Sequence, residues 1–284
     1  MANATLNCPL CCSNNILQRT TVGTFFKVWR CGECTFTWVD RNDLARPEAA
    51  ASYDNYGYNR HLRSSFEQMK PLYIKGLQQR ISRRLSDRSL QNCAFLDVGC
   101  ANGEYLWTAK SIGFGRVAGV EIDSSAAKLA SVYGEVVDDV EKFAPFTFDV
   151  VQIKNVLSNI PDFVGFLSSC LQVLKPDGFL LLDNPNQDSL TALLRNTLAR
   201  DYQKTGLYGH LRPPHVINGF NLASIKELYR RLHLTPTYIS TSYIGTSVVP
   251  YYPPNFTAKV LGLTTSFFGK GSLLITEGKS NVNT

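Results

Sequence analysis

Residues 93–103 read Cys-Ala-Phe-Leu-Asp-Val-Gly-Cys-Ala-Asn-Gly, and this stretch decides the fold of most of the chain. An apolar run that includes Phe95 and Leu96 ends at Gly99 and Gly103, and a helical pattern begins directly after them. Glycine lets the backbone turn sharply and approach a ligand, and the amide groups of a helix N-terminus face that ligand. The stretch therefore predicts a buried strand, a ligand-binding glycine loop and a helix.

Further strands and helices alternate after this loop. Strands are expected over residues 116–121, 135–137, 147–153 and 178–183, with helices over 104–113, 124–133, 162–174 and 187–199. Another helix should begin after Asn221, between a long loop and two final strands over 236–243 and 272–277. Strands that alternate with helices predict an α/β fold, in which a mostly parallel sheet carries helices on both faces.

The glycine loop differs from the fingerprint of a dinucleotide-binding protein. That fingerprint is G-x-G-x-x-G, whereas this loop has two glycines four residues apart. A ligand without a diphosphate needs fewer bare backbone amides. The spacing therefore argues against a dinucleotide cofactor.

In order and spacing, residues 93–183 resemble the class I S-adenosylmethionine-dependent methyltransferases. The resemblance implies a Rossmann-like sheet that closes with an antiparallel last strand, supplied by 272–277. It implies that S-adenosylmethionine is the cofactor. The cofactor-binding residues that it implies are Asp97, Gly99, Cys100, Gly103, Glu121, Ile122, Asp138, Asp139, Val140, Lys154 and Asn155.

Each part of the cofactor has an expected position. The loop 99–103 would hold the amino-acid end, and Glu121 would accept hydrogen bonds from both ribose hydroxyls. Asp139, or Asp138 beside it, would meet the adenine amino group. Lys154 and Asn155 would border the chamber in which the methyl group is transferred.

Four cysteines form a second motif. Cys8-x-x-Cys11 and Cys31-x-x-Cys34 are separated by nineteen residues, the arrangement of a zinc site with four thiolate ligands. Disulfides and a redox-active pair are the alternatives, but the first needs an oxidising compartment and the second does not need two matched pairs. The pattern predicts a structural Zn²⁺ held by these four residues in a small ribbon over residues 1–40.

Residues 41–92 should connect the ribbon to the methyltransferase domain, which we place at 93–284. The whole excess of positive charge, +6, falls in 60–92, where Arg80 and seven other basic residues accompany helical spacing of apolar ones. The pattern predicts an amphipathic helix with a basic outer face. That face would either be solvated or attract an anionic partner such as a sugar nucleotide, a lipid phosphate or RNA.

The combination of ribbon and cofactor domain resembles small-molecule methyltransferases with an N-terminal zinc ribbon, a group that includes sugar C-methyltransferases. The resemblance implies a small hydroxylated acceptor, either a saccharide or a nucleotide-sugar-like metabolite. A ribosomal-RNA-type methyltransferase and a non-catalytic cofactor-binding module are the alternatives. The segment after 147–153 departs from the group, because Asn155 and Asn159 stand where many relatives have histidines.

Two histidines are candidates for the catalytic base. His210 and His215 lie in the loop 200–220, which should cover the carboxyl ends of the strands. Histidine can deprotonate a hydroxyl near neutral pH, and the alternative is that either one only orders the loop. The aromatic insertion 245–270 would form a lid over the acceptor, a dimer surface or a membrane contact.

Two absences define the expected setting of the protein. No apolar run of the chain approaches the roughly 18 residues that a transmembrane helix needs, and the N-terminus lacks a basic and then apolar leader. We therefore expect a cytoplasmic protein. The sequence leaves open its oligomeric state, its acceptor and whether oxygen, carbon or nitrogen is methylated.

Overall fold

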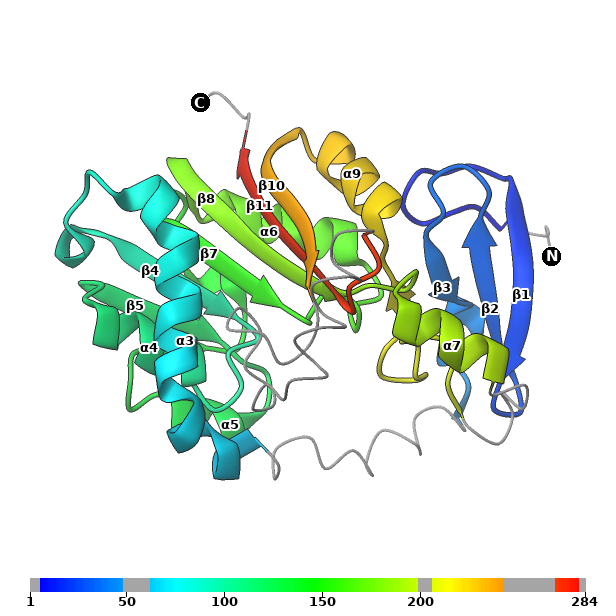
Figure 1. The fold of residues 1–284 in the computed structure, drawn as a ribbon, viewed down its shortest axis with the longest axis horizontal. Coiled ribbons are helices and arrows are strands. Elements are labelled where there is room, and N and C mark those ends of the chain that lie inside the picture. Colours follow the sequence, from blue (N-terminus) through cyan, green and yellow to red (C-terminus); the bar gives the residue numbers. More distant parts are fainter. Residues whose placement is uncertain (1–5, 48–61, 199–205, 243–268, 281–284) are drawn as a thin grey trace.

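A computed structural model describes residues 6–47, 62–198, 206–242 and 269–280 of the chain (Figure 1). Its main feature is a seven-stranded sheet in the order β10-β11-β8-β7-β4-β5-β6. The strands are β4 (Ala94–Val98), β5 (Arg116–Val120), β6 (Glu135–Val137), β7 (Phe148–Lys154), β8 (Leu174–Pro185), β10 (Leu234–Ser242) and β11 (Leu273–Ser280). Strands β4 to β8 are parallel, and β11 runs antiparallel to both β8 and β10. The expected α/β fold with an antiparallel last strand is confirmed.

Helices cover both faces of this sheet because its strands carry apolar side chains on both faces. Phe95 of β4 packs in one cluster with α3 (Leu62–Leu85) and α4 (Glu104–Ile112). Leu96 and Val98 of the same strand pack on the other face with α6 (Phe163–Gln172) and α9 (Leu222–Arg231). The shorter α5 (Ser124–Ala130) follows β5, and α7 (Leu190–Leu198) follows β8. A parallel sheet buried on both faces results, as expected for near-continuous apolar strands.

The N-terminal ribbon is a second, antiparallel sheet. It contains β1 (Ile16–Val22), β2 (Phe26–Cys31) and β3 (Thr37–Val39), and the short helix α1 (Arg41–Leu44) follows. Its fourth strand, β9 (Asn218–Gly219), comes from the far end of the chain and pairs with β3. The sequence predicted the ribbon, but it predicted neither the strand β1 nor the pairing of β3 with β9.

The ribbon packs directly on the methyltransferase sheet and shares its core. The ring of Phe36 lies 5.1 Å from that of Phe163 on α6 and 5.0 Å from that of Phe220, measured between ring centroids. Trp38 is buried in the same cluster. Although the sequence divides at residue 40, the packing is continuous across that boundary. The division into 1–40, 41–92 and 93–284 remains a prediction about sequence organisation.

Helix α3 corrects one expectation about charge. Arg80 was expected on a basic outer face, yet it is buried and its Nη1 donates to Asp183 Oδ2 at 2.9 Å. A guanidinium can be buried when its hydrogen bonds are satisfied and an opposite charge lies beside it. The ion pair therefore fastens α3 to the end of β8 instead of adding to a positive surface.

Candidate functional site

The glycine loop has the geometry that its sequence predicts. Gly99 and Gly103 have φ values of +77° and +88°, a backbone region that favours glycine. A Cβ on Gly99 would lie 2.4 Å from Cγ2 of Val156, which approaches from the loop after β7. The amides of Gly99 and Cys100 both donate to the carbonyl of Val120. The loop is thus drawn tightly between β4, β5 and the end of β7.

Glu121 joins this loop to the next one. Its Oε2 accepts a hydrogen bond from the amide of Ala101 at 2.9 Å, and its Oε1 accepts one from the amide of Asp123 at 2.9 Å. Each carboxylate oxygen retains a further lone pair, so the group can still accept hydrogen bonds from a ligand. Glu121 therefore stands half-buried at the carboxyl end of β5, held in place by two backbone amides.

The residues expected around an adenine ring lie beyond Glu121. Ile122 follows Glu121 directly, and 86% of its apolar side chain is exposed. Val140, which follows Asp139 directly, is buried. Asp139 Oδ1 accepts from the amide of Glu141 at 3.0 Å, whereas exposed Asp138 pairs with Lys142 at 2.5 Å, which lowers the pKa of Asp138. An exposed apolar side chain and a fixed carboxylate are the kinds of group that suit a flat aromatic ligand with a polar edge.

Asp97 and Cys100 support the loop from inside. Asp97 is buried on β4, where its Oδ1 accepts from Nε2 of Gln152 on β7 at 3.0 Å. Burial raises the pKa of Asp97 to about 7. The Cys100 thiol points at β5, because a Cβ on Gly119 would lie 2.6 Å from its Sγ, and burial raises the pKa of this thiol too. The side chain of Cys100 thus belongs to the core, and its backbone amide is engaged by the carbonyl of Val120.

Lys154 and Asn155 lie where β7 ends beside β8. The ammonium of Lys154 donates to the hydroxyl of Tyr105 at 2.5 Å and lies 3.8 Å from Oδ2 of Asp183. Asn155 has a φ of +59°, and its amide donates to the carbonyl of Asp183. Two cations, Lys154 and Arg80, therefore share one buried carboxylate. The sequence had not suggested Tyr105, Asp183 or Arg80 for this position, because each comes from a different element.

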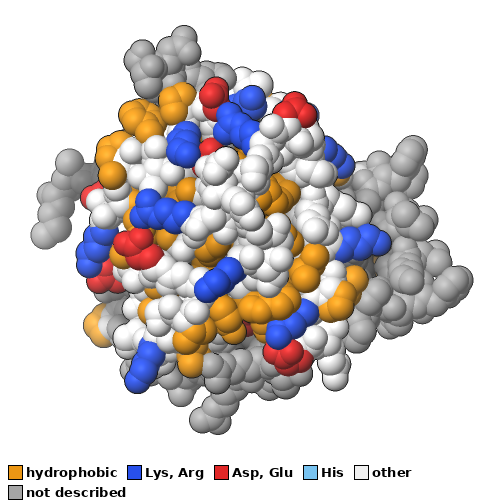
Figure 2. Space-filling model, turned by 90° about the vertical axis from the view of Figure 1, so that its left-hand side faces the viewer, with side chains coloured by type: hydrophobic (Ala, Val, Ile, Leu, Met, Phe, Trp, Pro, Cys, Tyr) orange, Lys and Arg blue, Asp and Glu red, His pale blue; other side chains and the backbone are white. Residues whose placement is uncertain are grey.

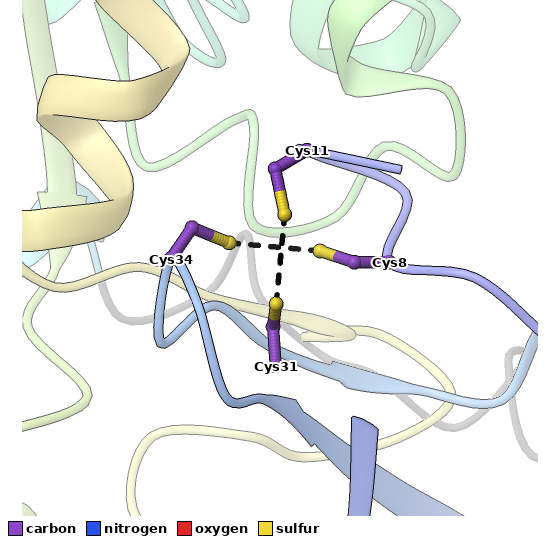
Figure 3. A group of neighbouring side chains, drawn as sticks. All are labelled: Cys8, Cys11, Cys31 and Cys34. Carbon is purple, nitrogen blue, oxygen red and sulfur yellow. Dashed lines mark hydrogen bonds between the residues drawn. The ribbon is translucent and has the colours of Figure 1, made fainter. Parts of the chain in front are cut away.

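Four cysteine thiols converge on one point in the ribbon (Figure 3). All their sulfur atoms lie within 4.8 Å of one another, with Cys8 and Cys34 at 3.6 Å and Cys11 and Cys31 at 3.5 Å. A tetrahedral zinc with Zn–S bonds of about 2.3 Å would separate its sulfurs by about 3.8 Å. The contact between the first pair lowers the pKa of Cys8 to about 5 and raises that of Cys34. Both the spacing and the donor atoms fit Zn²⁺.

The two candidate histidines have different surroundings. His210 is half-buried, and its Nε2 lies 3.0 Å from Oγ of Ser189. Burial, helped by the charge of Arg195, lowers the pKa of His210 to about 4, so the imidazole is neutral near pH 7. His215 is half-buried in a turn where its amide donates to the carbonyl of Arg212. Residues 200–205 of their loop, and 245–268 of the aromatic insertion, lie outside the described residues.

Charge on the described surface is mixed. On the face in Figure 2, Lys and Arg side chains are scattered among acidic and hydrophobic ones. On α3, Lys70 pairs with Glu67, and just beyond the helix Arg88 pairs with buried Asp149. An anionic partner and RNA therefore remain predictions without support from this surface. In the described part of the chain, no helix has both the length and the apolar character needed to cross a membrane.

The fold and the glycine loop together define a class I S-adenosylmethionine-dependent methyltransferase architecture. A family model for the methyltransferase domain matches residues 66–237, which is more than half of the chain. The chain belongs to this methyltransferase family.

Curated relatives carry one recurring name. The mitochondrial ubiquinone biosynthesis O-methyltransferase of Bos taurus is 25% identical over 173 residues, which cover 56% of this chain and 47% of that protein. The enzyme of the same name from Colwellia psychrerythraea is 25% identical over 202 residues, covering 63% and 80%. A third, from Thiobacillus denitrificans, is 29% identical over 110 residues, covering 35% and 47%. The chain thus spans about half the length of the first and third of these relatives.

Solved structures share the fold. A SAM-dependent methyltransferase from Methanosarcina mazei superposes with a TM-score of 0.51 at 19% identity, covering 68% of this chain and 94% of that one. The magnesium protoporphyrin IX methyltransferase of Synechocystis PCC 6803, solved with bound SAH, gives a TM-score of 0.51 at 13% identity and covers 85% and 100%. At these identities the likeness concerns the fold alone.

Proposed function

We propose that the protein transfers the methyl group of S-adenosylmethionine to a hydroxyl of a small acceptor. The observation that carries this proposal is the geometry of Glu121, whose carboxylate ties the glycine loop to the loop after β5 while keeping lone pairs for a ligand. A carboxylate at the end of that strand is well placed to accept hydrogen bonds from a ribose diol. The sulfonium of the bound cofactor supplies an electrophilic methyl group.

The remaining proposed cofactor contacts come from residues in and after strands β4 to β7. The loop 99–103 holds the amino-acid end through the close approach of its backbone, and buried Asp97 links the strand before that loop to β7. Ile122 and Val140 cover the adenine ring, and Asp139 accepts from its amino group because Asp138 is engaged by Lys142. Lys154 and Asn155 border the transfer chamber at the end of β7.

His215 takes the role of base in this proposal, and His210 the role of positioning its loop. Both imidazoles are half-buried, but that of His210 is bonded to Ser189, and its pKa of about 4 makes it a weak base near neutral pH. In-line transfer needs the acceptor oxygen aligned with the methyl group and its proton removed. His215 would remove that proton.

The class of acceptor follows from two lines of support. The curated relatives are named O-methyltransferases of ubiquinone biosynthesis, which favours oxygen as the accepting atom and a phenol-like acceptor. The resemblance to ribbon-containing enzymes favours a saccharide or sugar nucleotide. Both classes are small hydroxylated molecules, so a single experiment can separate them.

Zn²⁺ has a structural part in this proposal. Four thiolates complete a tetrahedral shell and leave no open position for a substrate. The ion would hold the two knuckles at residues 8–11 and 31–34 together, and thereby the ribbon.

The test combines cofactor binding with turnover. Calorimetry with S-adenosylmethionine and S-adenosylhomocysteine should give saturable one-site binding. The protein is then incubated with methyl-labelled cofactor and separate panels of phenols, catechols and sugar nucleotides, and labelled product is measured. Label in one panel identifies the acceptor class. Binding without turnover on any panel, or on a metabolite extract, would support a non-catalytic module, and failure to bind at about 1 mM cofactor would overturn the proposal.

A further inference from the structure

Four consecutive residues after β8, which we call the clasp (residues 186–189), together hold three different parts of the chain. Asn186 donates through its side-chain amide to the carbonyl of Gly271 at 2.8 Å and to that of Gly269 at 3.2 Å. These carbonyls belong to the segment that leads into β11. The first residue of the clasp therefore fixes the end of the long insertion to the carboxyl edge of the central sheet.

The second residue of the clasp holds the loop that carries the histidines. Gln187 Nε2 donates to the carbonyl of Tyr208 at 3.0 Å, and its Oε1 accepts from the amide of His210 at 2.9 Å. A Cβ on Gly209 would lie 2.5 Å from the same amide nitrogen, so the loop backbone lies against this side chain. Gln187 is only 3% exposed, and its buried amide is satisfied by these two partners.

The fourth residue, Ser189, holds the same loop through a side chain. Its hydroxyl lies 3.0 Å from Nε2 of His210 and also accepts from the amide of Ala192 in the first turn of α7. The imidazole is thereby held at the start of α7. Residues 187 and 189 together set both the backbone and the side chain of His210.

Asp188, between them, points the other way and binds the ribbon. Its two carboxylate oxygens accept from Nη1 and Nη2 of Arg30 on β2, at 2.9 Å and 3.0 Å. One of them also accepts from Nδ2 of Asn221 at 2.9 Å, and Asn221 donates in turn to Thr35 beside Cys34. Burial alone would raise the pKa of Asp188, but the hydrogen bonds and charge of Arg30 outweigh it and the pKa is lowered. The carboxylate is therefore a fixed anion in a two-pronged contact.

The ribbon and the short helix after it also contact the segments around Asn218 and α9. Arg41 donates to Asn218 Oδ1, and the side-chain amide of Asn218 donates to the carbonyls of Leu157 and Ile160 after β7. At the other end, Arg231 of α9 donates to the carbonyls of Pro9 and Leu10 in the first cysteine knuckle. The ribbon thus reaches the loops after both β7 and β8, beside α7 (Figure 1).

We propose that Asp188 is a positioning residue, through which the cysteine ribbon sets the position of the histidine loop for the acceptor. The inference rests on the proposed methyltransferase function. Arg30 gives Asp188 a fixed orientation, and the neighbouring clasp residues transmit it to residues 208–210 and 269–271. The ribbon is then a wall of the acceptor site rather than a separate module for binding a macromolecule.

A purely stabilising role would predict a different outcome. The side chains of Arg30 and Asp188 are 27% and 32% exposed, and an ion pair with that much solvent contributes little to the free energy of unfolding. Its two-pronged geometry fixes direction more than it adds stability. Substitutions of this pair should therefore change local order and acceptor recognition more than overall stability.

The experiment compares Asp188→Asn and Arg30→Met with Arg19→Met, which removes the same charge from an exposed position of the same ribbon. Amide hydrogen exchange in residues 206–220 and 269–271 should accelerate about tenfold in the first two variants and stay unchanged in the control. Zinc content and affinity for S-adenosylmethionine should match those of the wild type. Arg30→Lys, which keeps the charge but loses the fork, should give an intermediate acceleration.

Kinetics on an identified acceptor complete the test. KM for the acceptor should rise about tenfold, with kcat changed less and KM for the cofactor unchanged. Unaltered exchange in both segments, or an equal loss of cofactor affinity, would overturn the inference. If no acceptor is turned over, the proposed function fails while the exchange measurement still decides whether Asp188 transmits order. A variant that unfolds is replaced by Arg30→Lys, for which the same readouts apply.

Discussion

The two halves of the sheet are built in different ways. The half around β4 and β5 carries the proposed cofactor site, and the half around β8 carries the proposed acceptor site; we call them the cofactor half and the acceptor half. Around β4 and β5, Glu121 bonds to amides only twenty and two residues away in sequence. Around β8, Asp188 bonds to an arginine 158 residues away, and Thr35 of the ribbon bonds to Asn221, 186 residues away. The first half is held together by contacts between residues close in sequence. The second half is assembled from segments far apart in the sequence, so its geometry depends on how the whole chain packs.

Loss of zinc should have the largest effect and should fall on the acceptor half. Cys31→Ser removes one of four thiolates, and we expect zinc to fall from about one to below about 0.1 per chain because a complete tetrahedral shell is required. Metal analysis and near-UV circular dichroism measure this. Cys12→Ser, at an exposed neighbouring cysteine, is the matched control and should keep its zinc. Zinc retained in Cys31→Ser would remove that residue from the site.

Replacing His215 should separate the two halves by function. His215→Ala should lower turnover on an identified acceptor about a hundredfold or more, the usual scale for a general base, and leave cofactor affinity intact. Steady-state kinetics and calorimetry measure the two quantities. His233→Asn, just after α9, should leave both unchanged. Normal turnover in His215→Ala would mean that this residue only shapes its loop.

Glu121→Ala should affect the cofactor half alone. We expect S-adenosylmethionine to bind about tenfold to a hundredfold more weakly, because a charge-assisted acceptor and the link to Ala101 are both lost. Glu135→Gln on β6 removes the same charge from an exposed position and serves as control. Calorimetry that gives Glu121→Ala the wild-type affinity would place the ribose elsewhere.

The last prediction concerns pH and the boundary between the halves, where Asp97 of β4 meets Gln152 of β7. Asp97 has a pKa of about 7 in the folded protein and an ordinary value of 3.8, so the folded state holds a proton that the unfolded state releases. Its contribution to stability is therefore present at low pH and is lost as pH rises from about 4 through about 7.

Urea unfolding at several pH values tests this sign. Asp97→Asn should remove the decline, so that the difference in unfolding free energy between variant and wild type grows from pH 4 to pH 7. His210 acts in the opposite direction, since its lowered pKa costs stability as pH falls from about 6.5 to about 4. The comparison with wild type cancels that contribution. A difference that does not change with pH would contradict the assignment to Asp97.

Much of the fold was predictable, because its signals are local. The alternation of apolar segments placed the strands from β4 to β8 within a few residues, and the antiparallel β11 was expected from the family resemblance. The cysteine spacing predicted a cluster that the structure brings together. The strand β1 was missed because Leu17 and Arg19 leave much of it exposed, without the alternating apolar pattern that indicates a half-buried strand.

The candidate site was predictable only in part. The glycine loop, Glu121 and the carboxylates after β6 follow their strands directly, so a pattern of residues is enough to find them. Arg80 was misplaced on the surface, because the sequence cannot show that Asp183 lies within reach of its guanidinium. The polar run Asn-Gln-Asp-Ser at 186–189 was the only sequence signal for the clasp, and it does not say which segments it holds.

The sequence by itself determined the class of fold, the glycine loop and the four-cysteine cluster, since each follows from short motifs whose residues lie a few positions apart. Only the tertiary structure decided that the ribbon joins the methyltransferase sheet through β9, and that Asp188 faces Arg30. The physical reason is that contacts across more than a hundred residues depend on how whole elements pack. In this chain such contacts build the proposed acceptor side, while contacts between residues close in sequence hold Glu121 and the glycine loop on the proposed cofactor side.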